Sequence, residues 1–82
     1  MKISVIKDLL EHGREIELTY NGKRYSFTFG KNEEGKSIVA FCEFNKDDIE
    51  CETIDELLSS KYDSFLLTDM IESLSEEDLE IF

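Results

Sequence analysis

Carboxylates are the densest group of chemically competent side chains in this sequence. A calcium loop needs such ligands at fixed spacing around a tight glycine turn, but no glycine follows Gly35. Paired carboxylates that cleave glycosides need a cleft, and 82 residues offer little material to build one. The run is therefore interpreted as a solvated face or as a surface that docks a partner. Its members are Asp47, Asp48, Glu50, Glu52, Asp55 and Glu56.

The charge of the chain is concentrated in its second half. Residues 1–36 carry seven Lys and Arg against six Asp and Glu, whereas residues 37–82 carry two against fourteen, and the net charge is −11. An acidic half repels nucleic acid and anionic lipid, so neither is predicted as a direct partner. The acidity either keeps the protein soluble or engages a basic protein. Candidate contacts are Asp47, Asp48, Glu50 and Glu52, with Glu76, Glu77 and Asp78 as a second patch.

The single histidine and the two cysteines do not form a recognisable catalytic or metal-binding pattern. His12 precedes Gly13 at a predicted helix end, where a cation interacts favourably with the helix dipole. Cys42 and Cys51 with one distant histidine fall short of the four ligands of a structural zinc site, and no Cys-x-x-Cys occurs. We expect the cysteines to act as small buried apolar side chains. No metal, cofactor or catalytic residue is predicted.

Lys23 and Arg24 are among the few basic residues that lie close to aromatic ones. Basic residues beside aromatic ones, here Tyr20 and Tyr25, can bind single-stranded nucleic acid. Two cations on a protein of charge −11 make a weak case for it. The sequence has neither GxGxxG nor GxxxxGK[ST], so it encodes no phosphate-binding loop of those kinds.

The element that organises the chain is a β-hairpin within Glu15 to Phe29. Asn21-Gly22 divides two alternating runs and is typical of a type I′ turn, which needs positive φ at both central residues. A two-residue loop sets the register, because it pairs Tyr20 with Lys23, Leu18 with Tyr25 and Ile16 with Phe27. Apolar side chains then share one face of both strands.

A short helix from about Ser4 to His12 precedes the hairpin, and a third strand from Ser37 to Phe44 follows the loop Gly30 to Lys36. Both faces of that third strand are apolar, so alternation does not select the one that enters the core. Asn45 to Asp48 resembles a four-residue hairpin loop leading to a fourth strand at 49–52. This register predicts Phe44 opposite Ile49, Cys42 opposite Cys51 and Glu43 opposite Glu50.

The last thirty residues are predicted to be mainly helical. Thr53 and Glu56 fit a capping box that opens one helix. A second helix follows from the spacing of Leu67, Met70, Ile71 and Leu74, with Thr68 as its expected N-cap. Residues 62–66 form either a link or an earlier helix start, and residues 75–78 resemble another helix start. Residues 79–82 are expected to form a ragged turn against the body of the protein.

These elements together predict an α+β fold in one domain, residues 1–82. It would have a short N-terminal helix, an antiparallel meander of three to four strands, and two to three short C-terminal helices packed on one face of the sheet. Lys7, Asp8 and Glu11 interrupt the first apolar stretch, so we expect no signal peptide. No apolar run approaches the length of roughly 20 residues that spans a bilayer. A cytoplasmic protein with reduced cysteines is the expectation.

The sequence also resembles a group of small uncharacterised acidic α+β proteins. The similarity lies in LLEHGREIELTYNGKRYSF, FCEF, TIDELL and the acidic tail DLEIF, and it covers most of the chain. Proteins of this group come from low-GC Gram-positive bacteria and their mobile elements. The resemblance implies a cytosolic bacterial α+β domain. It transfers no activity and no site residues.

The leading functional hypothesis is a non-enzymatic module that binds another protein through its acidic surface or an exposed strand edge. A second hypothesis is a phage- or island-encoded inhibitor that presents carboxylates in place of nucleic-acid phosphates to an enzyme. A small enzyme or thiol-redox protein using Cys42 and Cys51 is the third.

Overall fold

The computed structural model describes all residues from Met1 to Phe82. Its helices are α1 (Ile3–Glu11), α2 (Ile54–Leu58), α3 (Leu67–Ser73) and the 3₁₀ turn η1 (Glu76–Asp78). Its strands are β1 (Ile16–Tyr20), β2 (Lys23–Lys31), β3 (Ser37–Glu43), β4 (Asp48–Cys51), β5 (Lys61–Tyr62), β6 (Phe65–Leu66) and β7 (Leu79–Ile81).

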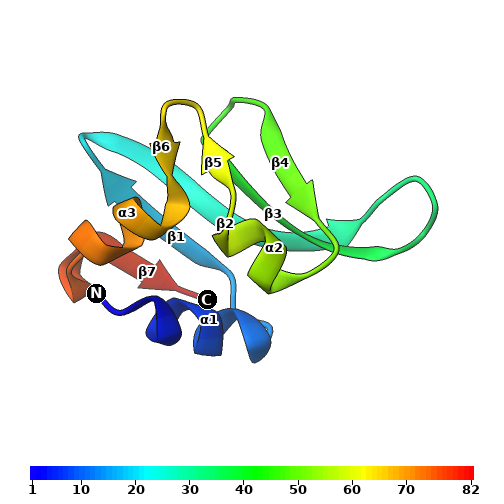
Figure 1. Cartoon of the computed structure of the whole chain (residues 1–82), viewed down its shortest axis with the longest axis horizontal. Helices are drawn as coiled ribbons and strands as arrows, with labels where there is room; N and C mark the ends of the chain where they lie inside the picture. The colour runs from blue at the N-terminus through cyan, green and yellow to red at the C-terminus, as the bar shows by residue number, and fades with distance from the viewer.

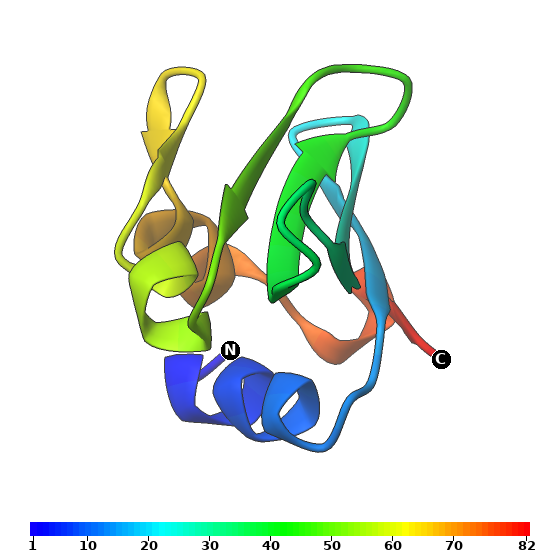
Figure 2. The same cartoon turned by 90° about the vertical axis from the view of Figure 1, so that its right-hand side faces the viewer.

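Five strands form one antiparallel sheet in the order β4-β3-β2-β1-β7, and β5 and β6 form a separate two-stranded hairpin (Figure 1). The helices and the β5–β6 hairpin lie on one side of the sheet (Figure 2). We call the opposite side the open face. The predicted α+β class is confirmed, with a larger sheet than expected. No helix is long and apolar enough to cross a membrane.

The β1–β2 hairpin has the register predicted from Asn21-Gly22. Both turn residues have positive φ, 50° and 76°, as a type I′ turn requires. Ile16 and Leu18 of β1 and Phe27 of β2 are fully buried in the main hydrophobic cluster. Alternating burial follows from the two-residue period of a strand, so one face of the hairpin becomes the floor of the core.

The structure identifies the core face of β3, which alternation could not select. Val39 and Phe41 pair with Phe29 and Phe27 and belong to the main hydrophobic cluster. Ile38 and Ala40 are also buried, but they lie on the other side of the strand and outside that cluster. The central position of β3, between β2 and β4, accounts for low exposure on both of its sides.

The predicted pairing of β3 with β4 is wrong by three residues. Phe41, rather than Phe44, lies opposite Ile49, and Cys51 lies opposite Val39 instead of Cys42. The two cysteines consequently occupy opposite faces of the sheet. The predicted contact between Glu43 and Glu50 is also absent, since Glu50 lies opposite Ala40.

The C-terminal prediction needs two further corrections. Leu79–Ile81 is not a ragged turn but strand β7, which extends the sheet by pairing with β1. Residues 62–66 are neither a plain link nor a helix start, because Tyr62 pairs with Phe65 across the two-residue loop of the β5–β6 hairpin. Ser75 and Asp78 do form a capping box, but around η1, a single 3₁₀ turn.

Two of the three residues that were predicted to begin or end a helix have that role in the structure. Gly13 follows α1 with φ of 76°, and the Thr53 side chain accepts the Glu56 backbone N–H at the start of α2. Thr68 does not cap α3, because the N-cap is Leu66, two residues earlier, and Leu66 makes no side-chain hydrogen bond. All four residues predicted for its apolar stripe, Leu67, Met70, Ile71 and Leu74, are buried.

Substitutions of Gly22, in the β1–β2 turn, and of Gly30, in β2, test whether the positive φ at Gly22 requires glycine. Gly22→Ala is expected to lower the free energy of unfolding by about 1–2 kcal/mol, because an L-residue is strained at φ of 76°. Gly30→Ala is the control, since its added methyl would meet Ile38 Cδ1 at 3.9 Å and its φ is not positive. We expect that control to raise stability by about 0.5–1 kcal/mol in urea unfolding. Equal midpoints for the two variants would contradict the prediction.

Candidate partner-binding edge and its groove

The first predicted acidic patch lies along a free edge of the sheet. Asp48 and Glu50 stand opposite Cys42 and Ala40, so both side chains are on the open face, where they are exposed. Alternate residues of a strand are about 6.8 Å apart. Asp47 precedes the strand in the turn and Glu52 follows it, and both are exposed. The structure thus brings these four candidates together along β4.

The backbone of β4 also presents unused hydrogen-bonding groups. Phe44 N–H donates to the Arg24 carbonyl at 3.0 Å, so even-numbered residues of β3 bond to β2 and odd-numbered ones face β4. Ile49 and Cys51, opposite Phe41 and Val39, therefore form the ladder with β3. The N–H and C=O groups of Asp48 and Glu50 point away from the sheet.

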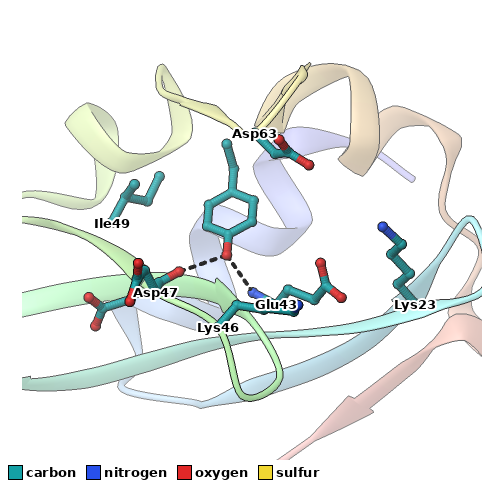
Figure 3. Close-up of a pocket in the computed structure, with 8 residues that line it drawn as sticks. Lys23, Glu43, Lys46, Asp47, Ile49 and Asp63 are labelled. Atoms are coloured by element: carbon teal, nitrogen blue, oxygen red, sulfur yellow. Dashed lines mark hydrogen bonds between the residues drawn. The ribbon is translucent and has the colours of Figure 1, made fainter.

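A groove of about 490 Å³ opens at the start of this edge (Figure 3). Its walls carry more negative than positive charge, and neither of its two lysines makes an ion pair. The close-up shows Asp47 on one side of the groove and Lys23 on the other. The lining residues are Lys23, Glu43, Lys46, Asp47, Asp48, Ile49, Tyr62 and Asp63.

Tyr62 fixes the turn at the bottom of the groove. Its hydroxyl accepts the Glu43 N–H at 3.1 Å and donates to the Asp47 carbonyl at 2.7 Å. In the observed register these two residues would form the next hydrogen-bonded pair after Phe41 and Ile49. The phenol oxygen thus stands in the ladder between a donor and an acceptor. It ends the pairing of β3 with β4 while leaving both groups satisfied.

The ring of Tyr62 holds the β5–β6 hairpin against the sheet. It meets Phe41 edge-on at 5.2 Å between ring centroids and Tyr25 at 6.1 Å. Phe65 adds an edge-on contact with Tyr25 at 5.6 Å. The preferred edge-to-face geometry of these pairs contributes to stability beyond the apolar area that they bury.

The second predicted patch lies at the other side of the sheet. Glu76, Glu77 and Asp78 form η1, directly before β7, whereas the first patch is on β4. Four strand spacings separate β4 from β7, which is about 19 Å. Asp78 is partly engaged, since its carboxylate accepts the Ser75 N–H at 3.0 Å. The structure does not join the two patches.

The remaining carboxylates of the run serve the first two helices. Asp55 pairs with Lys7 of α1 at 2.9 Å, and this hydrogen bond is the main reason why the pKa of Lys7 is raised. Glu56 accepts a hydrogen bond from the Thr53 hydroxyl at 3.0 Å. Both carboxylates therefore interact with another side chain of the protein, unlike the carboxylates of Asp48 and Glu50.

The basic residues of the hairpin tip have separate roles. Arg24 donates to Thr19 at 2.9 Å and pairs with Glu17 at 3.2 Å and Glu80 at 3.1 Å, which ties β2 to β1 and β7. Its guanidinium also lies 5.5 Å from the centre of the Phe44 ring. These contacts engage Arg24 within the protein, whereas Lys23 lines the groove.

His12 and the cysteines lie apart from the groove. His12 Nδ1 is 2.8 Å from the Asp8 carbonyl at the end of α1, in agreement with the predicted structural position. The Cys42 thiol is 3.7 Å from the Ser26 hydroxyl and the Cys51 thiol is 3.9 Å from the Ser60 hydroxyl. No group of three or more His, Cys, Asp or Glu side chains is arranged to hold a metal ion.

Comparison with protein-family models, curated proteins and solved structures found no match to this chain.

Sequence reasoning missed Tyr62 and Asp63. The available signal was the two-residue loop Asp63-Ser64 between two aromatic residues, which is a hairpin pattern with an aspartate where φ is positive, 53°. The groove itself could not have been found in this way, because its residues come from four separate segments of the chain.

The structural role of the Tyr62 hydroxyl can be tested with a phenylalanine variant, which lacks only that oxygen. Tyr62→Phe is expected to lower the free energy of unfolding by about 1–3 kcal/mol, because Glu43 N–H and Asp47 C=O lose their partner. Faster hydrogen exchange of the Glu43 amide should accompany the loss. Tyr20→Phe is the control, because the Tyr20 hydroxyl makes no hydrogen bond within the protein and its removal should leave both quantities nearly unchanged. Similar losses in both variants would contradict the assigned role.

Because Tyr25 is buried, we expect the free energy of unfolding to depend on pH in the alkaline range. Burial raises its pKa above the ordinary 10.0, and the nearby carboxylates of Glu43 and Asp63 raise it further. The unfolded chain therefore loses this proton at lower pH than the folded one, so the free energy of unfolding falls as pH rises through 10. Tyr25→Phe should reduce the slope of stability against pH between about 9 and 11 in urea unfolding. Parallel curves for the two proteins would exclude this contribution.

Proposed function

We propose that this protein is a non-enzymatic module that binds a basic segment of another protein at the edge of β4. The observation that carries the proposal is the coincidence of two features on one strand. The backbone groups of Asp48 and Glu50 face away from the sheet, and the side chains of the same two residues form a row of exposed carboxylates on the open face. Asp47 and Glu52 are exposed at the two ends of this row, and Glu52 also pairs with Lys36 at 3.6 Å. An open strand edge and a charged surface are thus available to the same partner.

An extended segment would bind here by adding a strand to the sheet. Hydrogen bonds with the backbone of Asp48 and Glu50 would supply affinity that does not depend on sequence. Lysine or arginine side chains on the open face would meet the two carboxylates and give preference for a basic segment. The overall charge of −11 speeds the encounter with such a partner at low ionic strength.

The absence of a reactive arrangement in the groove supports a binding role over an enzymatic one. Nucleophilic catalysis needs an activated nucleophile within reach of a base. The groove is lined by carboxylates, two lysines, Ile49 and a tyrosine whose hydroxyl already makes two hydrogen bonds. Cys42 and Cys51 face opposite sides of the sheet, which also counts against a dithiol redox pair.

The inhibitor hypothesis receives less support from the geometry. A nucleic-acid mimic needs a continuous band of charges, but the two patches occupy opposite edges of the sheet. Along β4, carboxylates on one face are about 6.8 Å apart, whereas one DNA strand carries a charge every 3.4 Å or so of helix axis. The open face of β4 therefore carries about half that charge density.

The setting that we propose is the cytoplasm of a bacterium. Both cysteines are free, as in proteins of a reducing compartment. The resemblance described in the sequence analysis, to small acidic proteins of Gram-positive bacteria, would imply the same setting.

The test is a capture experiment with two charge-matched variants. The tagged protein, used as bait in a lysate of the cells that encode it, is expected to retain a basic protein that elutes at raised salt. Asp48→Lys with Glu50→Lys should abolish this capture, because the row along β4 becomes cationic. Glu76→Lys with Glu77→Lys changes the net charge equally at the other patch and should leave capture intact.

Two outcomes would contradict the proposal. Equal loss in both double variants would mean that only the overall charge matters, and no loss in either would mean that the row on β4 is not the contact. A photo-cross-linking residue at position 50 provides a second readout, since it must label the captured protein.

A further inference from the structure

We propose that β7 is a second and independent docking strand, which accepts an extended segment of alternating apolar and basic residues from another protein. It lies at the opposite edge of the sheet from β4, so this inference does not depend on the function proposed above. The occupant is assigned from three properties of the edge: its free backbone groups, its exposed apolar side chains and its charge.

The free backbone groups follow from the pairing of β7 with β1. Phe82 N–H donates to the Glu15 carbonyl at 2.8 Å, and Glu17 lies opposite Glu80. In an antiparallel ladder, Glu80 and Phe82 therefore face β1, whereas Ile81 directs both N–H and C=O outward. The Leu79 N–H bonds to the Glu76 carbonyl, which leaves the Leu79 C=O as a third free group. An incoming antiparallel strand can pair with Ile81 through two hydrogen bonds and with Leu79 through one.

The side chains at this edge are unusually apolar for an exposed position. Ile81 is 43% exposed and Phe82 is 58% exposed, the largest value among the exposed large apolar residues. A natural edge strand is usually protected by charge, proline or a covering element. On β7 the only charged side chain, Glu80, is already paired with Arg24. An apolar residue of the incoming strand opposite Ile81 would cover this surface.

The negative charge beside β7 favours the binding of a basic segment over the binding of a second copy of this chain. Glu76 and Glu77 are exposed and make no ion pair, and an antiparallel strand on β7 would run past Asp78 toward them. Cationic residues in that part of the strand would be attracted to all three carboxylates. Two copies of this chain, each with a net charge of −11, would instead repel each other as they approach.

The test is an NMR titration of the ¹⁵N-labelled full chain with a synthetic peptide of alternating valine and lysine. We expect the amide signals of Leu79 to Phe82 to move. A peptide with glutamate in place of lysine should not move them. Removing the donor from the peptide residue opposite Ile81 by N-methylation should weaken binding roughly fivefold to tenfold, and this arm leaves the protein itself unaltered.

Two proline variants make the matched comparison between the edges. Ile81→Pro removes an outward N–H of β7, and Glu50→Pro removes an outward N–H of β4; proline is tolerated at such edge positions. Ile81→Pro should weaken the binding that is measured from the signals of Leu79 to Phe82 roughly fivefold to tenfold, whereas Glu50→Pro should leave the binding measured from those signals unchanged. The inference is overturned if no signal of β7 moves, if the glutamate peptide binds equally, or if binding responds to Glu50→Pro alone. That last result would place the peptide on β4, as the proposed function requires, and not on β7.

Discussion

The second half of the structure depends on the two hydrogen bonds that the Tyr62 hydroxyl makes. Glu43 N–H and Asp47 C=O would otherwise bond to each other and continue the β3–β4 ladder by another pair. With the phenol oxygen between them, both polar groups are satisfied while the strands diverge. Because the ring is anchored on Phe41 and Tyr25, one side chain joins the β5–β6 hairpin, the β3–β4 turn and the hydrophobic core. Loss of that oxygen therefore affects the turn, the hairpin and the groove together.

The register of β4 against β3 determines which face of the sheet becomes acidic. The side-chain period of a strand is two, so a shift of β4 by one residue would turn Asp48 and Glu50 toward the core and Ile49 outward. Burial of an unpaired carboxylate is costly, which makes that alternative unfavourable. The observed register keeps Ile49 opposite Phe41 on the core face and places the two carboxylates on the open face. The electrostatic surface is thus a consequence of packing beneath it.

Local signals in the sequence predicted local structure well and long-range structure poorly. Asn21-Gly22, Thr53 with Glu56, and the spacing of Leu67, Met70, Ile71 and Leu74 each act within a few residues. The hairpin, the Thr53 N-cap and the burial of the four apolar side chains are confirmed. The predicted β3–β4 register failed because it was taken from the length of the loop alone, whereas the observed register places Ile49 opposite Phe41 and Cys51 opposite Val39 on the core face. Strand β7 was missed because it pairs with β1, more than sixty residues earlier in the chain. The predicted acidic residues were found on the surface, but only the topology shows that they belong to two different edges.

The distribution of charge explains how a small sheet can keep two edges uncovered. Open edges favour self-association, and natural proteins usually counter this with charged or covered edge strands. Here the carboxylates of Asp48 and Glu50 would face those of a second copy across an antiparallel pairing of two β4 edges, and the overall charge of −11 opposes the approach of two molecules at either edge. The same charges attract a basic strand. Repulsion between copies and attraction toward a basic partner therefore arise from one set of residues, so neutralising an edge should lose the partner and promote self-association at that edge.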